Sequence, residues 1–371
     1  MHMPHLIQLP EILAARDRIA GVAVRTPLLR LDPERIRASG FDLPVNGPTI
    51  FLKNEAAQPI GSFKLRGAYS HVAALAERDP EALRRGVITF SSGNHAQGVA
   101  YAARALGTKA VIVMPENAPR IKREATAALG AEIVTVGPAS TERKQKAEEL
   151  VALHGYAMVP PYDDPLIIAG QATCGLEIAE QLAELDPTQA DSTLVLSPVS
   201  GGGLLSGIAT GVTLASEAAS RTPPLIWGCE PELAADAHAS FYEKTLIEWP
   251  AADTSRTLAD GLRTQSLGAR NFDHILRYVG GIVTVSEAEI RSATRLILAA
   301  TDIVAEPSGA VTLAAALFHA HQLPHADRII AVVSGGNLDP DLRAELEAET
   351  RALLTPSKLP AEQIPCPAAH V

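Results

Sequence analysis

Gly61-Ser62-Phe63-Lys64-Leu65-Arg66-Gly67-Ala68 places a lysine between two large apolar residues, just after a turn and at the start of a helical pattern. An ammonium group in apolar surroundings has a lowered pKa, and its neutral amine can attack an aldehyde. The ordinary alternative is a lysine that reaches solvent from the first turn of a helix. The rest of the chain decides between these two interpretations of Lys64.

The composition is typical of a soluble globular enzyme, with 371 residues, 47% hydrophobic and 20% charged. A net charge of −10 and the lack of a basic stripe argue against a nucleic-acid partner. No apolar run approaches the roughly 20 residues that a membrane span needs, and the N-terminus has no signal pattern. Widely spaced Cys174, Cys229 and Cys366 suit a reducing compartment. We therefore expect a cytoplasmic protein with no membrane partner.

Short runs rich in valine and isoleucine alternate with helical patterns along most of the chain. The expected strands include 87–90, 110–114, 133–136, 193–196 and 328–333. Continuous apolar runs are typical of strands buried on both faces, and strand–helix alternation favours parallel sheets. The sequence predicts an α/β protein with two domains, each a mostly parallel sheet flanked by helices.

The order of these elements predicts one discontinuous domain and one continuous domain. We expect residues 1–85 and 162–345 to form the large domain and residues 86–161 to form the small domain. Residues 346–371 carry several prolines from Pro356 onward. We expect a C-terminal tail there.

Two loops that follow expected strands could bind anionic groups, because ligands bind beyond the carboxyl ends of parallel strands. Ser91-Ser92-Gly93-Asn94-His95 begins a helix and could bind a carboxylate or phenolic oxygen, or act as a plain N-cap. Ser200-Gly201-Gly202-Gly203-Leu204 also precedes a helix. Its backbone N–H groups could close around a phosphate, or the glycines could form only a tight turn.

The glycine loop has a rival interpretation as a nucleotide site. Gly201, Gly203 and Gly207 loosely resemble a dinucleotide fingerprint, with Glu230 in the place of the ribose-binding acid. The spacing departs from G-x-G-x-x-G, and such a match alone is weak.

Two further loops carry polar side chains at strand ends. In Ser334-Gly335-Gly336-Asn337 a hydroxyl could meet a ring nitrogen, or it could cap the next helix. Glu230 and Asp236 flank a turn whose carbonyls could join the two carboxylates around a hard cation. A solvated acidic helix start is the alternative there.

The stretches Gly61 to Ala68 and Ser91 to Gly98 together resemble the serine/threonine dehydratase and serine racemase family. These are pyridoxal-phosphate enzymes of the tryptophan-synthase-β type. The resemblance extends over about residues 20–340. Further segments fall in the family's order: Pro161-Tyr162-Asp163-Asp164, Ile168-Ala169-Gly170-Gln171, the glycine loop, Asp260-Gly261, Glu306-Pro307-Ser308-Gly309 and Ser334-Gly335-Gly336-Asn337.

This resemblance implies that pyridoxal 5′-phosphate is the cofactor and that it is bound covalently through Lys64. It implies that Asn94 hydrogen-bonds the cofactor's 3′-oxygen, that Ser200 to Leu204 hold its phosphate, and that Ser334 hydrogen-bonds its ring nitrogen. A serine there need not keep the nitrogen protonated. The ring is then a weaker electron sink, which suits elimination.

The resemblance also implies places for the substrate and for a cation. The loop from Ser91 to His95 would receive the substrate carboxylate. Many catabolic threonine dehydratases have alanine where this chain has Ser92, whereas in racemases that serine is an acid/base opposite the lysine. Ser92 thus leaves open either racemisation or carboxylate binding alone. Glu230, Asp236 and the carbonyl of Ala234 match a site that holds Mg²⁺, Ca²⁺ or Mn²⁺ in some members.

The function implied is a dehydratase that converts an L-β-hydroxy amino acid of the serine or threonine type into a 2-oxo acid and ammonia. A dehydratase of 3-hydroxyaspartate or 3-phenylserine, a serine racemase, and a non-catalytic cofactor carrier are the alternatives. Cysteine-synthase-like β-replacement is disfavoured, because that group has Asn-Pro before its lysine where this chain has Gly61-Ser62. The family also implies a homodimer.

Overall fold

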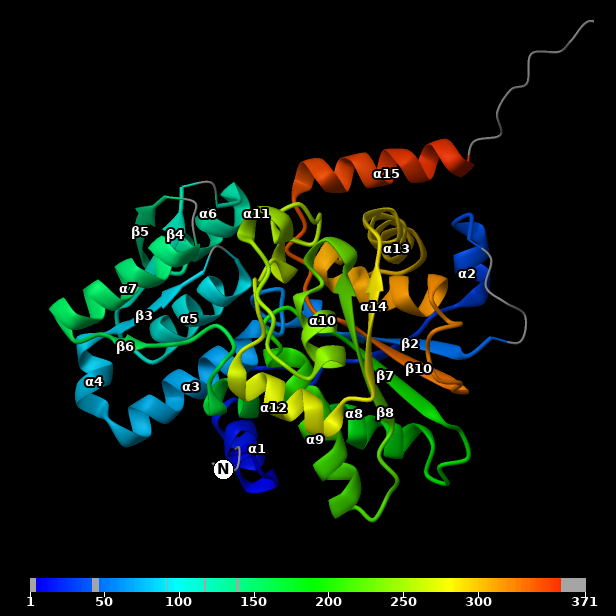
Figure 1. The fold of residues 1–371 in the computed structure, drawn as a ribbon, viewed down its shortest axis with the longest axis horizontal. Helices are drawn as coiled ribbons and strands as arrows, with labels where there is room; N and C mark the ends of the chain where they lie inside the picture. The colour runs from blue at the N-terminus through cyan, green and yellow to red at the C-terminus, as the bar shows by residue number, and fades with distance from the viewer. Residues whose placement is uncertain (1–4, 42–46, 92, 117, 138–139, 355–371) are drawn as a thin grey trace, which may run out of the picture.

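Two sheets organise the structure, which is a computed structural model that describes residues 5–41, 47–91, 93–116, 118–137 and 140–354. The larger sheet has the strand order β1-β2-β10-β7-β8-β9, and the smaller has the order β5-β4-β3-β6 (Figure 1). Among the described strands, only β1 pairs antiparallel, with β2. The predicted α/β fold with two mostly parallel sheets is confirmed. The strands are β1 (Leu28–Arg30), β2 (Thr49–Asn54), β3 (Val87–Phe90), β4 (Ala110–Pro115), β5 (Glu132–Val136), β6 (Ala157–Met158), β7 (Thr193–Pro198), β8 (Leu225–Pro231), β9 (Gly281–Val285) and β10 (Arg328–Val333).

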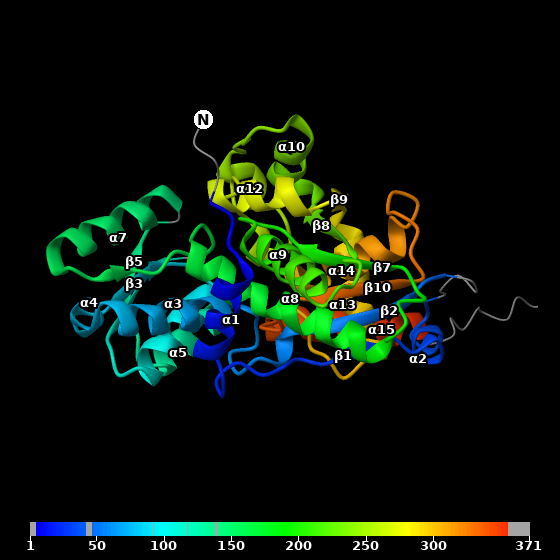
Figure 2. The same cartoon turned by 90° about the horizontal axis from the view of Figure 1, so that it is seen from below.

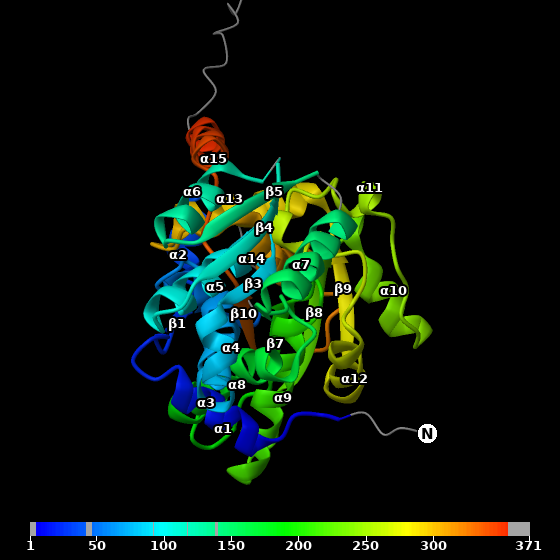
Figure 3. The same cartoon turned by 90° about the vertical axis from the view of Figure 1, so that its left-hand side faces the viewer.

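Helices cover both faces of each sheet (Figures 1 and 3). Within the described residues, no helix is both long and apolar enough to cross a membrane. The α-helices are α1 (Leu9–Arg18), α2 (Pro33–Ala38), α3 (Lys64–Arg78), α4 (Pro80–Arg85), α5 (Asn94–Ala105), α6 (Arg120–Ala128), α7 (Ser140–His154), α8 (Pro165–Leu185), α9 (Gly203–Ala218), α10 (Asp236–Glu243), α11 (Ala251–Thr254), α12 (Ala269–Tyr278), α13 (Glu287–Ala300), α14 (Pro307–Phe318) and α15 (Pro340–Leu354). Three short 3₁₀ turns are described as well: η1 (Glu55–Ala57), η2 (Glu232–Ala234) and η3 (Asp260–Leu262).

The larger sheet is buried on both faces because successive side chains of a strand point to opposite sides. Ile50 and Leu52 of β2 belong to one core, which α13 and α14 complete. Phe51, between them, belongs to the other core, which α8, α9 and α12 complete. Val195 of β7 lies in the same core as Phe51. Double burial explains why these strands are continuous apolar runs rather than alternating ones.

The smaller sheet repeats this arrangement. Val87 and Ile112 pack against α3 and α5, whereas Ile88 and Val111 pack on the opposite side against α7. The four strands all come from the segment that was expected to be the small domain. The exact division into domains stays a prediction.

Helices α8 and α9 cross the face of the larger sheet in close contact (Figure 2). A Cβ on Gly211 would overlap the carbonyl oxygen of Ala172, and one on Gly175 would lie 2.6 Å from that of Ile208. Side chains at these positions would push the two backbones apart. The glycines therefore set the distance between the helices and, with it, the position of the amino end of α9.

The first residues of the expected C-terminal tail, 346–371, are helical. Helix α15 continues to Leu354 and packs against α13. Arg291 of α13 pairs with Glu345 at 3.1 Å and with Glu349 at 2.6 Å. These ion pairs and the buried side chain of Leu346 join α15 to the rest of the structure. The remainder, 355–371, lies outside the described residues.

Candidate active site

The loops that follow β2 and β10 lie side by side, because these two strands are parallel neighbours. The N–H of Phe63 donates to the carbonyl of Ser334 at 3.0 Å, and the N–H of Gly336 donates to the carbonyl of Gly61 at 2.9 Å. Ser62 and Gly335 form the antiparallel bridge between these two bonds. The segments that carry Lys64 and Ser334 thus form one rigid unit.

Lys64 is the first residue of α3. Its Nζ donates to the carbonyl of Pro161 at 2.7 Å and lies 5.2 Å from the centre of the Phe63 ring. Burial lowers the pKa of Lys64 to about 8. A substantial fraction of this amine is therefore neutral near physiological pH, as attack on an aldehyde requires.

The second candidate loop requires its glycines. A Cβ on Gly201 would lie 2.6 Å from the ring of Tyr162, and one on Gly202 would lie 2.8 Å from the Cβ of Asn271. Gly202 also has φ +90°, which disfavours any other residue. Helix α9 begins at the next residue, so its first N–H groups have no partners within the helix. This arrangement suits an anion.

The third glycine of the possible nucleotide fingerprint, Gly207, has a structural explanation. A Cβ on Gly207 would lie 2.7 Å from the Cβ of Gln171 in α8. Gly207 therefore serves the close packing of α8 and α9. The carboxylate of Glu230 is buried and accepts the N–H of His238 at 2.9 Å. Both residues have structural explanations without a nucleotide.

Asn94 has its side-chain amide held from two sides. Its Nδ2 donates to Oε1 of Glu306 at 2.5 Å, and its Oδ1 accepts from Nδ2 of Asn337 at 2.8 Å. Asn337 belongs to the loop after β10 and also donates to the carbonyl of Ile60. The amide of Asn94 is thus oriented by two residues from the part of the structure that contains the larger sheet.

Ser334 is buried at the end of β10. Its hydroxyl oxygen lies 3.4 Å from the carbonyl of Ser308, which is long for an O–H···O bond. A weakly held hydroxyl can donate to a better acceptor, such as a ring nitrogen. The geometry is compatible with the expected role of Ser334.

The loop between β3 and α5 is only partly described, because Ser92 lies outside the described residues. The hydroxyl of Ser91 accepts the N–H of Gly93 at 3.3 Å. The ring of His95 is buried, with its Nε2 3.1 Å from the carbonyl of Val159. Burial and the nearby charge of Lys64 lower the pKa of His95 to about 3, so its ring is neutral. His95 can thus offer a carboxylate its backbone N–H but not a charged ring.

Lys122 of α6 connects the smaller sheet's helices to the larger unit. Its Nζ lies 2.6 Å from Oδ2 of Asp260 and 3.2 Å from Oε2 of Glu306. A Cβ on Gly93 would be 3.9 Å from the same Nζ. Burial alone would lower the pKa of Lys122, but the charges of Glu306 and Asp260 raise it above its usual range. Lys122 is thus a fixed cation beside the loop expected to receive a carboxylate.

The fourth candidate loop brings Glu230 and Asp236 together in the interior. Neither carboxylate oxygen of Asp236 has a hydrogen-bond partner within the described residues. Burial raises the pKa of Asp236 to about 8, and burial together with the charge of Asp236 raises the pKa of Glu230 well above its usual range. Ala234, in η2 between them, is also buried. The alternative of a solvated acidic helix start is therefore wrong, because both carboxyl groups are buried.

Comparison with known proteins decides the family. A family model described as pyridoxal-phosphate dependent enzyme matches residues 19–335. This chain belongs to that family. The match covers Lys64, the glycine loop and every strand of the larger sheet, from β1 to β10. It confirms the resemblance found in the sequence.

Curated relatives from two organisms cover most of the chain. An L-threo-3-hydroxyaspartate ammonia-lyase of Saccharomyces cerevisiae is 36% identical over 331 residues, which are 89% of this chain and 93% of that protein. A serine racemase of Schizosaccharomyces pombe is 35% identical over 334 residues, 89% and 94% of the two chains.

A solved structure shows the same fold. The crystal structure of a threonine deaminase from T.th. is similar with a TM-score of 0.78 and 42% sequence identity. The similarity covers 90% of this chain and 99% of that one. Fold type II of the pyridoxal-phosphate enzymes is thereby confirmed.

The residues present fit pyridoxal phosphate by the chemistry of their donors. The amine of Lys64 is partly neutral, the glycine loop leaves helix N–H groups for a phosphate, and the hydroxyl of Ser334 is weakly held. The contacts of these residues with the cofactor stay predictions.

Three residues around this site were not assigned roles from the sequence. Lys122 lies in a segment rich in charged residues, Asn271 in a polar stretch, and Tyr162 in a motif whose geometry the sequence does not define. Each reaches the site from a distant part of the chain, so only residue spacing in three dimensions could have identified it.

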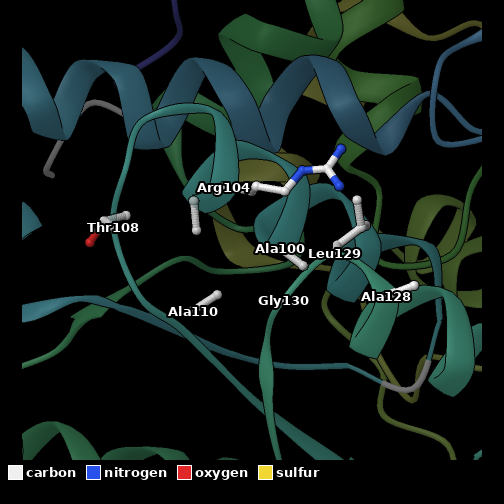
Figure 4. A pocket seen from close by; sticks show the side chains of 8 residues that line it. Ala100, Arg104, Thr108, Ala110, Ala128, Leu129 and Gly130 are labelled. Atoms are coloured by element: carbon white, nitrogen blue, oxygen red, sulfur yellow. The ribbon is translucent and has the colours of Figure 1, made fainter.

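Cavities elsewhere contain none of the expected site residues. One of about 260 Å³ lies between α5 and α6, with Ala100, Arg104 and Leu129 in its lining (Figure 4). Another of about 450 Å³ lies at the opposite, amino ends of β7 and β8. Ligands of parallel sheets bind at the carboxyl ends, so neither cavity competes with the site at Lys64.

Proposed function

We propose that the chain is a pyridoxal-phosphate dependent dehydratase that eliminates water from an L-β-hydroxy amino acid of the serine or threonine type. The observation that carries this proposal is the amine of Lys64, whose pKa is about 8, at the junction of the two paired loops. The ammonia-lyase and deaminase names of similar proteins support the reaction class.

Each side chain has a separate task in this reaction. The bound cofactor supplies an electron sink that acidifies the proton on the substrate's α-carbon. The loop from Ser91 to His95 holds the substrate carboxylate, and the amine of Lys64 takes the α-proton as general base. The β-hydroxyl takes up a proton and leaves as water, so that the α-proton and the hydroxyl together make up the water lost. The enamine released then takes up water and becomes a 2-oxo acid and ammonia.

The test of this assignment is Lys64→Ala. It should abolish 2-oxo acid formation and the yellow colour of the holoenzyme, because the amine that binds the cofactor is lost. Lys109→Ala, at an exposed lysine paired with Glu132, is the control and should keep both. Borohydride reduction and peptide mapping of the wild type should label residue 64. A label elsewhere, or turnover by the Lys64 variant, would refute the proposal.

The preferred substrate is the finer part of the proposal. A panel of L-serine, L-threonine, threo-3-hydroxyaspartate and 3-phenylserine, scored for 2-oxo acid, ranks the four dehydratase possibilities. Racemisation is kept as a second candidate because a serine racemase is 35% identical to this chain. Measuring D-amino acid beside 2-oxo acid from one L-substrate separates the two activities. A cofactor carrier would produce neither.

We propose a divalent cation, Mg²⁺ or else Ca²⁺ or Mn²⁺, between Glu230, Asp236 and the carbonyl of Ala234. The two unpartnered oxygens of Asp236 support it, because hard cations prefer such oxygen ligands. Within the described residues, no cluster of three or more acidic, histidine or cysteine side chains could hold a metal ion, so the proposed site relies on two carboxylates and one carbonyl.

Asp236→Asn tests the cation site. Mg²⁺ should raise the melting temperature of the wild type after chelator treatment, because the ion binds the folded state alone. The variant should lose that rise, yet be at least as stable without metal, since a neutral amide replaces a buried acid. Glu232→Gln, at a neighbouring exposed acid, should respond like the wild type. An undiminished response of the Asp236 variant would exclude the site.

A homodimer with an amino-acid substrate, located in the cytoplasm, completes the proposal. These parts rest on the family resemblance and on the composition. Light scattering of the purified protein measures the oligomeric state directly, and a monomeric mass would contradict it.

A further inference from the structure

Helix α12 packs directly against the glycine loop. Its residue Asn271 is fully buried, and the Cβ of Asn271 is the atom that a side chain on Gly202 would meet at 2.8 Å. The side chain of Asn271 also lies 2.9 Å from the place of a Cβ on Gly268, just before the helix. A buried amide needs hydrogen-bond partners, and it finds them in the loop and in α9.

The carbonyl of Gly201 accepts two hydrogen bonds, one from α12 and one from the residue just before it. Nδ2 of Asn271 donates to it at 2.7 Å, and the N–H of Gly268 donates at 3.1 Å. The Oδ1 of Asn271 lies 3.1 Å from the hydroxyl of Ser206. That hydroxyl also lies 2.7 Å from the carbonyl of Gly202. Asn271 therefore links the loop to the first turn of α9.

These contacts have an electrostatic consequence for an anion. A loop that binds a phosphate must present its N–H groups and turn its carbonyl oxygens away, because the oxygens carry negative partial charge. The carbonyls of Gly201 and Gly202 are satisfied on the side of α12 and Ser206. The N–H groups of Gly201 and Gly203 make no backbone hydrogen bond within the described residues. Asn271 holds the peptide groups in that orientation.

We propose that Asn271 is a positioning residue for the phosphate of the cofactor, acting through the carbonyl of Gly201. The inference rests on the proposed function only for the identity of the phosphate-bearing ligand. It assigns a task to α12, which lies outside every motif of the sequence.

The test compares two ligands that differ by the phosphate. Pyridoxal 5′-phosphate and pyridoxal share the aldehyde and ring, but only the first reaches the glycine loop. Asn271→Ala should weaken pyridoxal phosphate about tenfold, the effect of losing one buried hydrogen-bond partner. It should leave the binding of pyridoxal unchanged. Both are measured by titration of cofactor-free protein and by borohydride trapping at Lys64. The ³¹P resonance of bound pyridoxal phosphate should also differ between the Asn271→Ala holoenzyme and the wild-type holoenzyme.

His274→Ala is the matched control on the same helix. His274 is buried too, but its ring nitrogens face the N–H of Ile7 and the carbonyl of Arg270, away from the loop. This variant should lose stability without changing the ratio of the two affinities. If it changes that ratio as much as Asn271→Ala does, the role of Asn271 is structural only.

Two outcomes overturn the inference. One is an equal loss of both ligands in Asn271→Ala, and the other is an unchanged affinity for pyridoxal phosphate. If the alanine variant does not fold, Asn271→Ser, which disturbs packing less, is held to the same criteria. Failure of the proposed function looks different, because a wild type that binds pyridoxal phosphate without turnover still permits the comparison.

Discussion

The carbonyl of Pro161 accepts a hydrogen bond from the amine of Lys64, although the two residues are far apart in the chain. Pro161 lies between the smaller sheet and α8, so the path of the chain between the two sheets places it there. The lysine was identified from its apolar neighbours in sequence. Its resting partner was not, because a proline carbonyl carries no sequence signal of its own.

The lowered pKa of Lys64 predicts how the rate of cofactor capture depends on pH. Below a pKa of about 8 the amine is mostly protonated, and above it the amine is mostly neutral and nucleophilic. The rate at which cofactor-free protein captures pyridoxal phosphate should rise about tenfold per pH unit below 8 and level off above it. Stopped-flow absorbance measures this rate. A pH-independent rate would contradict the prediction, and Lys64→Ala should show no capture at any pH.

Arg66, two residues after the lysine, anchors α3 in a buried ion cluster. Its guanidinium pairs with Glu55 at 2.8 Å and with Glu177 at 2.7 Å. Burial alone would raise the pKa of Glu55, but the charge and hydrogen bonds of Arg66, with the charge of Lys53, lower it to about 2. The cluster joins β2, α3 and α8, so it fixes the helix on which Lys64 stands.

Arg66→Leu should lower the free energy of unfolding by about 3–5 kcal/mol, because it leaves Glu55 buried without its partner. In the wild type, the stability from Glu55 is present above its unfolded pKa of about 4.5 and is lost as pH falls toward 2. The Arg66→Leu variant should not lose stability from Glu55 as the pH falls. Urea unfolding at two pH values measures both effects. Arg84→Leu, at an exposed pair with Glu81, should change stability by less than about 1 kcal/mol.

At the scale of elements, the contact of α8 with α9 sets the position of the glycine loop, Ser200 to Leu204. Gly211 and Gly175 permit that contact, and Gly207 continues it toward the loop. The sequence showed a cluster of glycines but not its purpose, since glycines of a loop and of a helix interface look alike in one dimension. The contacts in the structure distinguish the glycines of the loop from those of the helix interface.

Gly211→Ala should destabilise the protein, since its Cβ would overlap the carbonyl of Ala172. Overpacking costs about 1–3 kcal/mol, which exceeds the gain of about 1 kcal/mol from alanine's helix propensity. Thermal unfolding of the cofactor-free protein measures the balance. Ala218→Gly, at the exposed end of α9, measures the propensity difference without the overlap. A Gly211 variant as stable as the wild type would show that the helices can separate freely.

For the whole molecule, the sequence predicted the architecture better than the site. Strand 87–90 lies where it was expected, and both parallel sheets follow from buried apolar runs. Short helices such as α2, α4 and α12 have too weak a sequence signal to be predicted, because tertiary contacts rather than local preference hold them. Lys64 could be predicted from its apolar neighbours, and the loops could be predicted because ligands bind beyond the carboxyl ends of parallel strands. Lys122 and Asn271 could not, since their partners lie more than a hundred residues away or across a helix interface.

β10 lies inside the larger sheet, between β2 and β7, and carries the loop that pairs with the residues before Lys64. During synthesis on the ribosome, the lysine emerges long before that strand exists, and until then β2 and β7 have no shared neighbour. Such long-range pairing comes late in folding. A chain that ends before β10 therefore lacks the loop that pairs with the residues before Lys64. We expect ribosome-bound fragments that stop short of β10 to stay colourless with pyridoxal phosphate, and fragments that extend past it to be able to take up the coenzyme.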